Sequence, residues 1–535
     1  MNSSHSYWPT IPKIIHQTWK NNNIPGPTHW PDSWKKINPD WDYRLWTDAD
    51  LLALVQRHYP ALEELYTSYP NPVQRADLGR YLVLHHCGGI YADIDTECLS
   101  PLDPLSEDKR VIFAEEPVEH HHHTIPLGLN RQFFNGIMAS PKGHPFWEHM
   151  IEMVVRCRHA KNFVLESTGP IVLSGAVKSY PDQDQLCLNS CHIFNPLTVT
   201  GRYSAAHAYG DYLGYSFANH YWSSSWFTIG RRKWITTLKE AWRKLQHKLT
   251  RGPYLTRTQL RQQINMSVLY QPIAPSDQNV SILIPVRDAE PFLDQCIALL
   301  TALDYPKNRI KIVFCEGDSI DGTHAKLAQF ATSHAGIFRD IQILQYKTNA
   351  PLDRSQRWRA EIQRTRRSNL AKVRNYLVPC GVDQDDHWAL WIDADVCDYD
   401  PCILNRLLAE KAKVVTPDCV REWGGPSYDL NAFHDDGDKR DHHYYRYVRN
   451  GIFSPPANYL RRRHLHSLRY LDRVPLSSVG GTMLLVHSSV FRAGITFPEN
   501  PYDHLLETEG FGRICRDLGV TPIGLPNVHI KHVNS

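Results

Sequence analysis

Residues 88–97 read Gly-Gly-Ile-Tyr-Ala-Asp-Ile-Asp-Thr-Glu. Apolar residues alternate here with Asp93 and Asp95, so a strand would place both carboxylates on one face, two residues apart. Carboxylate and phosphate oxygens are the ligands that Mg²⁺ and Mn²⁺ prefer. The stretch therefore predicts a divalent-cation site at the edge of a sheet, with open positions for a diphosphate.

A complete helix is expected directly before this strand. Asn71 is a favourable N-cap, Pro72 suits the first helical position, and the glycine pair at 88–89 follows the last turn. Asp77 and Arg80 lie three residues apart and share one face of that helix. The turn at the glycine pair would bring their carboxylate and guanidinium to the acidic pair. The alternative is an ordinary helix ion pair beside a surface acidic turn.

Six motifs of the first half follow one another in a recognisable order. Residues 11–20, 75–81 and 88–95 have characteristic spacing, and residues 135–139, 168–170 and 220–226 continue the series. Residues 10–230 thereby resemble the DXD sugar-transferase family, glycosyltransferase family 32, whose members include fungal initiating α-1,6-mannosyltransferases.

This resemblance implies a role for each matching residue. Asp77 and Arg80 would hold the donor sugar, and Asp93 the sugar or ribose hydroxyls. Asp95 would bind the metal. His220, as a further metal ligand, and Trp226 would lie on the diphosphate side. The remaining residues that the resemblance places at the nucleotide sugar are His16, Gln17, Trp19 and Asn135.

The composition is that of a globular chain with room for two or three domains, at 535 residues, 42% hydrophobic and 21% charged. Lys and Arg outnumber Asp and Glu by 59 to 56, a net charge of +3, so no nucleic-acid partner is expected. Apolar runs stay below the roughly 18 residues of a membrane span, and residues 1–5 lack the basic and apolar regions of a signal peptide. The sequence therefore predicts a cytoplasmic protein or one bound peripherally to the cytoplasmic side of a membrane.

Twelve cysteines are scattered along the chain, several in apolar runs where a reduced thiol packs as a small hydrophobe. Cys187 and Cys191 form the one close pair, and a zinc site would lack its second pair. Residues 120–123 are four consecutive histidines, which indicate a solvated loop or an adventitious metal site.

A basic amphipathic helix is predicted between residues 231 and 251, where Lys and Arg accompany an apolar stripe that includes Trp234 and Trp242. The stripe would either pack on the N-terminal domain or lie at an anionic membrane surface. Polar residues up to 277 read as a linker. We therefore expect domains at 1–230 and 278–535, joined by residues 231–277.

Strands alternate with helices from residue 278 onward. Strands are expected at 280–286, 310–314, 341–344 and 388–396, with helices ending near 303, starting after 323 and spanning about 354–379. This alternation predicts a mostly parallel sheet with its site at the carboxyl ends of the strands. Those ends carry Arg287, Asp318 and a second Asp-x-Asp at Asp393 and Asp395.

Residues 278–535 resemble the Anp/Mnn/Van family of mannan-polymerase subunits, glycosyltransferase family 62. The matching motifs fall at residues 284–289, 316–323, 372–375, 391–395, 428–431, 480–482, 507–511 and 532–534. The resemblance implies that Asp318 contacts the nucleotide base and that Asp393, Asp395 and His532 hold the metal and diphosphate. Glu507 or Glu509 would face the acceptor, and His529 competes with His532 for the metal. The other implied donor-binding residues are Arg287, Lys372 and Arg374.

Together the two halves predict an α/β protein with two GT-A-type Rossmann-like domains in tandem. By resemblance it is a bifunctional, retaining glycosyltransferase in which Mn²⁺ or Mg²⁺ acts as a Lewis acid on the leaving diphosphate. GDP-mannose is the expected donor of the second half, and UDP-galactose, UDP-glucose and UDP-N-acetylglucosamine stay open for the first. The expected acceptor is a glycan or a glycolipid.

Two other classes of function are alternatives to a bifunctional transferase. In one, a half has lost its chemistry and serves as a carbohydrate-binding or scaffold domain, against which the intact Arg80, Asp95 and Asp395 argue. The other is a metal-dependent phosphohydrolase, but neither acidic pair stands in the Asp-x-Asp-x-Thr setting of a nucleophilic aspartate.

Overall fold

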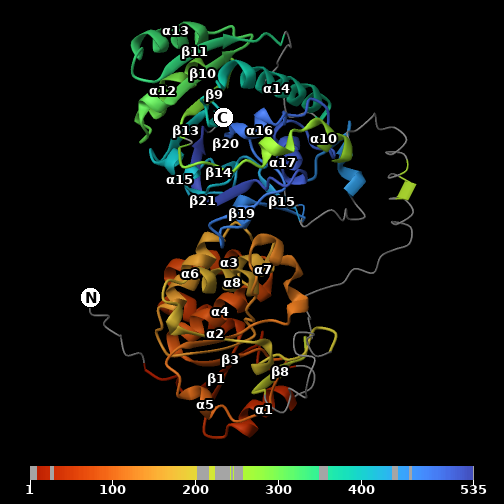
Figure 1. The fold of residues 1–535 in the computed structure, drawn as a ribbon. Coiled ribbons are helices and arrows are strands. Elements are labelled where there is room, and N and C mark those ends of the chain that lie inside the picture. Colours follow the sequence, from red (N-terminus) through yellow and green to blue (C-terminus); the bar gives the residue numbers. More distant parts are fainter. Residues whose placement is uncertain are drawn as a thin grey trace. The chain divides into compact units, whose positions relative to one another are not determined.

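The computed structural model describes residues 9–24, 29–201, 216–222, 241–242, 245, 257–276, 278–348, 360–435, 444–456, 459 and 461–533. The chain forms two compact units (Figure 1). The first comprises residues 1–230 with 467–470, and the second residues 231–466 with 471–535.

The first unit is built on a six-stranded sheet in the order β2-β1-β3-β6-β5-β7. Its inner strands β1 and β3 run parallel, and β6 is antiparallel to β3 and β5. A separate ribbon pairs β4 with β8. The strands are β1 (Ile14–Thr18), β2 (Asp42–Trp46), β3 (Gly89–Ala92), β4 (Thr96–Cys98), β5 (Val111–Ala114), β6 (Ile137–Ser140), β7 (Leu186–Asn189) and β8 (Ala218–His220). The helices are α1 (His29–Ile37), α2 (Asp48–His58), α3 (Glu63–Ser68), α4 (Pro72–Cys87), α5 (Asp103–Ser106), α6 (Phe146–Arg156), α7 (Val164–Ser167) and α8 (Pro170–Ser179).

Helix α4 has the ends that the sequence predicts. Asn71 forms a capping box with Gln74, and Pro72 occupies the first turn. Gly88 and Gly89 follow with φ of 69° and 98°, and a Cβ at Gly89 would lie 2.5 Å from the Ile14 carbonyl oxygen. Glycine is therefore required where the helix turns into the central strand.

The predicted strand through Asp95 is too long. Strand β3 ends at Ala92, and Asp93 begins a turn in which the Thr96 amide donates to the Asp93 carbonyl at 3.1 Å. The two carboxylates therefore do not alternate along a strand, and the prediction that they share a strand face is wrong. The chain leaves the sheet at Asp93 because it must turn to pair β4 with β8.

The second unit contains a nine-stranded sheet in the order β11-β10-β9-β12-β20-β14-β21-β13, with β19 beside β21. Strands β9, β10, β11 and β12 are parallel, and β20 is antiparallel to its neighbours β12 and β14. The strands are β9 (Val280–Val286), β10 (Ile310–Glu316), β11 (Asp340–Gln345), β12 (Trp388–Ile392), β13 (Val396–Tyr399), β14 (Val414–Val420), β15 (Phe433–Asp435), β16 (Val448–Arg449), β17 (Ile452–Phe453), β18 (Arg462–His464), β19 (Val474–Pro475), β20 (Met483–His487) and β21 (Ile523–His532). The helices are α10 (Arg257–Gln263), α11 (Met266–Leu269), α12 (Glu290–Ala302), α13 (Thr323–Ser333), α14 (Ala360–Gly381), α15 (Ile403–Ala409), α16 (Ser488–Arg492) and α17 (Glu507–Asp517).

Helices cover both faces of the parallel part of this sheet. Ile282 and Ile312 share a buried cluster with Leu293 of α12 and Leu327 of α13. The end of α14 approaches the alternate residue Leu283, on the other face. The predicted α/β class is confirmed, with a sheet that is parallel through β11, β10, β9 and β12.

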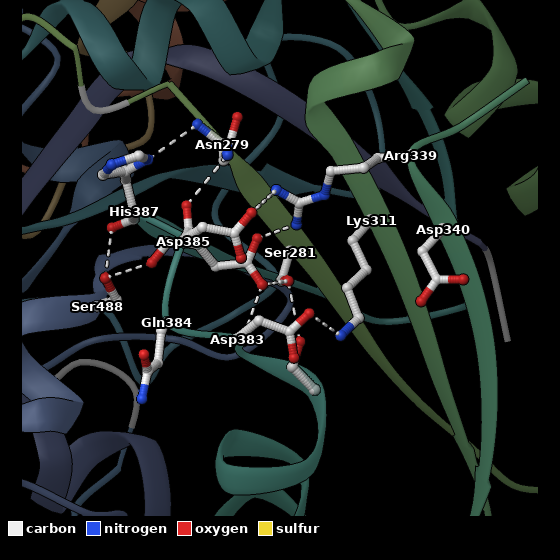
Figure 2. A network of polar contacts seen from close by, with 12 residues as sticks. Asn279, Ser281, Lys311, Arg339, Asp340, Asp383, Gln384, Asp385, His387 and Ser488 are labelled. Carbon is white, nitrogen blue, oxygen red and sulfur yellow. Dashed lines mark hydrogen bonds and ion pairs between the residues drawn. The ribbon is translucent and has the colours of Figure 1, made fainter.

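A polar network closes the amino-terminal edge of this sheet, opposite the second Asp-x-Asp (Figure 2). Asp386 is fully buried and accepts hydrogen bonds from the Ser281 hydroxyl at 2.7 Å and the Asp383 amide at 2.8 Å. Lys311 pairs with Asp383 at 2.7 Å, and Arg339 pairs with Asp386. Lys311 and Arg339 come from the starts of β10 and β11, so we assign the network to fixing the strand starts.

Among the described residues, no helix combines the length and apolarity needed to cross a bilayer. All twelve cysteines are free thiols. Most of the predicted basic helix at 231–251 lies outside the described residues; Trp242 and Leu245 are described and are exposed. In the histidine run, His121 is buried and hydrogen-bonded to the Glu116 carbonyl, so a fully solvated loop is not what forms there.

Candidate active sites

The first site lies at the carboxyl end of β3. Ligand atoms of Asp93, Asp95 and His220 all lie within 4.8 Å of one another, a spacing that suits a single cation. His220 Nε2 is 3.1 Å from Asp95 Oδ1. The β4–β8 ribbon sets this distance, because it pairs Thr96, the residue after Asp95, with His220.

Arg80 connects the helix α4 to the acidic pair. Its guanidinium is 3.0 Å from Asp93 Oδ1 and 3.1 Å from Asp77 Oδ1, and it donates to the Asn135 carbonyl at 2.9 Å. The guanidinium also lies over the Tyr91 ring, 4.7 Å from its centre. With a side chain only 5% exposed, Arg80 is a fixed buried cation that holds the first aspartate of the pair.

Asp77, the other carboxylate that pairs with Arg80, has a raised pKa. Burial raises the pKa of Asp77 to about 6, although Arg80 lowers it. The Asn135 amide and the Thr168 hydroxyl donate to its two oxygens at 3.0 and 3.1 Å. Burial also raises the pKa of Asp93, against the attraction of Arg80. Added positive charge at this site would therefore stabilise both carboxylates.

Other residues that the family resemblance assigns to the donor have hydrogen-bond partners within the protein. Both ring nitrogens of His16 are hydrogen-bonded, one to the Gly88 carbonyl and one to the Trp46 indole, and burial lowers its pKa to about 4. Gln17 donates to the Asp93 carbonyl at 3.1 Å and so supports the turn. Trp19 donates to the Asn23 carbonyl. Trp226 lies outside the described residues.

The second site lies in the turn between β12 and β13, beside a cavity of about 320 Å³. The cavity is lined by Asp393, Asp395 and His532 and by the segments that follow β9 and β10. His532 Nε2 lies 3.1 Å from Asp395 Oδ2. Burial lowers the pKa of His532, but its interactions with Asp395 outweigh burial and raise it. His529 instead lies 3.9 Å from Asp418, so His532 is the histidine at the acidic pair.

Arg374 occupies the place in the second site that Arg80 has in the first. Its side chain is 1% exposed, and Nη2 lies 3.7 Å from Asp393 Oδ1. Its Nε donates to Glu507 Oε1 at 2.9 Å, and the guanidinium lies 4.9 Å from the centre of the Trp391 ring. Glu507 adopts a left-handed backbone conformation, with φ of 55°, at the first position of α17. Such a conformation is uncommon outside glycine, so this ion pair is held at a cost in backbone strain.

The two sites therefore repeat one arrangement. In each, the first aspartate faces a buried arginine that lies over the aromatic residue two positions earlier, Tyr91 or Trp391. The second aspartate faces a histidine from a later strand, at 3.1 Å in both halves. Each site thus offers a carboxylate and an imidazole to a divalent cation, and a fixed cation behind the other carboxylate.

The cavity of the second site contains some of the predicted donor residues and not others. Arg287 lines it, and Asp318 accepts two hydrogen bonds from Thr348, which lines it too. Lys372 is exposed and is not among the lining residues. Glu507 and Glu509 are 4% and 3% exposed, and neither lines the cavity.

Glu509 belongs to a buried ion cluster. It accepts from Arg367 at 2.8 Å and from Arg462 at 3.2 Å. Burial raises the pKa of Glu509, but the two arginines outweigh it and lower the pKa below its usual value. A carboxylate held in this way is poorly placed to meet an acceptor.

Two residues next to the second site received no role from the sequence. The Tyr428 ring lies 4.1 Å from the His532 ring. Asp429 accepts from the amide and hydroxyl of Thr482, whose carbonyl accepts from the Asp393 amide. The motif at 428–431 signalled their importance, but only the fold shows that they support the acidic turn.

Comparison with known proteins gives a match in each half. A family described as "Glycosyltransferase sugar-binding region containing DXD motif" matches residues 29–112, and the Anp1 family matches residues 262–501. Inositol phosphoceramide mannosyltransferase 3 of Schizosaccharomyces pombe is 36% identical over 184 residues, 32% of this chain and 48% of that protein. Mannosyl phosphorylinositol ceramide synthase SUR1 of Saccharomyces cerevisiae is 34% identical over 180 residues, 32% of this chain and 42% of that protein. Mannan polymerase complex subunit mnn9 of S. pombe is 28% identical over 274 residues, 48% of this chain and 80% of that protein.

The chain spans about half the length of the first two of these relatives. The predicted resemblance of the two halves to two different families is confirmed.

Proposed function

We propose that this chain, one half similar to the DXD sugar-transferases and the other to the Anp1 family, carries two separate metal-dependent glycosyltransferase sites. The observation that supports the proposal is the repeated arrangement of Arg80, Asp93, Asp95 and His220 in one unit and of Arg374, Asp393, Asp395 and His532 in the other. A scaffold or binding domain has no need to keep a buried arginine beside the first aspartate of the pair and a histidine beside the second. We assign the sites to residues 1–230 and 278–535, joined by 231–277.

The names of the relatives support the choice of donor and acceptor that we propose. Two of them are named for mannosyl transfer to inositol phosphoceramide and one for a mannan polymerase complex. We therefore propose mannose as the transferred sugar, GDP-mannose as the donor of the second site, and UDP-sugars as the other donors to test at the first. The acceptors would be a phosphoceramide-type glycolipid and a mannan-like glycan. A lipid acceptor requires access to a membrane surface, for which the basic segment at 231–251 is the proposed contact.

The side chains of the two sites have matching roles in the proposed transfer. Asp95 with His220, and Asp395 with His532, would hold Mn²⁺ or Mg²⁺, which supplies Lewis-acid stabilisation of the charge that develops on the leaving diphosphate. Arg80 and Arg374 oppose the burial that raises the pKa of Asp93 and Asp393, to about 7 for Asp393, and hold both carboxylates in place. Arg287 lines the second cavity, where its guanidinium would bind a phosphate oxygen of the donor.

Retention fits this arrangement. In a front-face displacement the bond between the anomeric carbon and the diphosphate oxygen breaks, and the acceptor oxygen forms the new bond on the same face. The acceptor proton passes to the leaving diphosphate oxygen, so the protein needs no dedicated base. This agrees with the burial of Glu507 and Glu509 in ion pairs with arginines.

Removing the metal should abolish activity in both halves. We expect full-length protein treated with EDTA to release nucleotide from GDP-mannose at least about a hundredfold more slowly, because a metal ion supplies several kcal/mol of transition-state stabilisation. Adding Mn²⁺ or Mg²⁺ should restore the rate. The control is the Asp95→Ala/Asp395→Ala protein with Mn²⁺, which should stay inactive. Full turnover in a metal-free preparation would refute the proposed role of the acidic pairs.

A further inference from the structure

Strand β14 is followed by a turn that presents a tryptophan to solvent. The turn spans residues 421–426 and is closed at its base by a bridge between Val420 and Ser427. Trp423 stands in it with 50% of its surface exposed. Within the described part of the chain, its indole has no hydrogen-bond or ring partner.

The turn is rigid. The Gly425 amide donates to the Glu422 carbonyl at 2.8 Å, and Gly424 has φ of 71°, which glycine adopts without strain. The Ser427 hydroxyl at the base donates at 2.6 Å to Asp418, which is fully buried. Tryptophan is a highly buried residue on average, and these hydrogen bonds instead hold Trp423 on a turn that exposes half of its surface.

The turn starts and ends at the second site. Arg421 lies over the Tyr428 ring at 4.7 Å, and that ring lies 4.1 Å from the His532 ring, which faces Asp395. Neither Tyr428 nor Trp423 is among the residues that line the 320 Å³ cavity. Tyr428 thus lies beside His532 without sharing the proposed nucleotide cavity, and Trp423 stands in the turn that leads to Tyr428. An acceptor must reach the reacting carbon from outside that cavity.

We propose that Trp423 is the stacking platform of an acceptor subsite that binds a hexopyranose ring. A pyranose has an apolar face of C–H groups and a rim of hydroxyls, which an indole surface and flanking polar groups complement. Arg421 and Glu422, both exposed next to Trp423, supply donors and acceptors for that rim. This inference rests on the transferase function proposed for the second site.

Sugar binding can be measured directly by saturation-transfer NMR. The full chain with Mg²⁺, which is diamagnetic, and GDP is mixed with methyl α-D-mannopyranoside, and sorbitol, an open-chain hexitol without a ring face, is the control ligand. We expect saturation transfer to the mannoside ring protons but not to sorbitol, and at least a fivefold weaker signal in Trp423→Ala. Ile337→Ala removes another exposed apolar side chain, just before β11, and should keep the signal.

An unchanged mannoside signal in Trp423→Ala, or an equal signal from sorbitol, would overturn the subsite. A Trp423→Ala protein that keeps the mannoside signal but sediments less with phosphatidylcholine–phosphatidylserine vesicles would also overturn the subsite, since Trp423 would then be a lipid contact. GDP-mannose turnover by the wild type is measured in parallel. Its absence would contradict the proposed function, whereas loss of the mannoside signal only in Trp423→Ala would still support the subsite.

Discussion

Methionine in place of Arg374 is expected to slow donor turnover at the second site at least about a hundredfold, on the order of 3 kcal/mol of transition-state stabilisation. The substitution keeps an apolar side chain against Trp391 but removes the cation that links Asp393 to Glu507. Asp393 then loses this counter-charge, and Glu507 keeps only the more distant Arg367, at 3.9 Å, among the described residues. Breaking a buried ion pair in this way should also lower the free energy of unfolding by about 3–5 kcal/mol.

The measurement is nucleotide release from GDP-mannose in an Asp95→Ala background, together with the unfolding midpoint in urea. Arg364→Met is the matched control, because Arg364 is exposed on the same helix α14 and donates only to the Asn450 carbonyl. It should change neither quantity appreciably. A folded Arg374→Met protein with the turnover of the control would show that Arg374 does not organise the site.

Alanine in place of Gly136 should inactivate the first site without removing any of its chemical groups. An added Cβ would lie 2.7 Å from Asp93 Oδ2 and 2.2 Å from the Phe134 ring. Asp93 cannot simply withdraw, because its amide donates to the Gly136 carbonyl at 2.7 Å. We expect turnover at the first site to fall about a hundredfold, with an overpacking cost of roughly 1–3 kcal/mol in stability.

The second site of the same molecule is the internal reference and should keep its rate. Gly143→Ala serves as the control for modest destabilisation, since Gly143 has φ of 69° but a Cβ there would meet nothing within 4 Å. Turnover at the first site should survive in Gly143→Ala. If both variants lose the same fraction of activity, general destabilisation and not the displaced carboxylate explains the loss.

The sequence predicts best what local chemistry decides. The capping residues of α4 and the glycine pair set that helix within a residue, and the apolar runs locate β9 and β10. The alternation of apolar residues with aspartates at 90–95 predicts a strand that is too long, because the pairing of β4 with β8 ends β3 at Ala92. That pairing joins segments more than a hundred residues apart, and no local pattern shows it.

The candidate site divides in the same way. Spacing alone brought Asp77, Arg80 and the acidic pair together, whereas the two histidines and Arg374 were assigned through family resemblance. The pairing of Arg374 with Glu507 could not be predicted, since the two residues are 133 apart in the chain. The use of both His16 nitrogens inside the protein likewise depends on Trp46, which only the fold brings near.

The central claim is that the chain holds two independent transfer sites, and four proteins test it: the wild type, Asp95→Ala, Asp395→Ala and the double variant. Each is incubated with Mn²⁺ and a panel of nucleotide sugars, including GDP-mannose and UDP-sugars, and released nucleotide is measured. Sites that share no partners should respond independently to substitution. Each single variant should therefore keep the turnover of the other site, and only the double variant should lose both. Loss of all turnover in either single variant, while it remains folded, would instead show one composite site with a supporting domain.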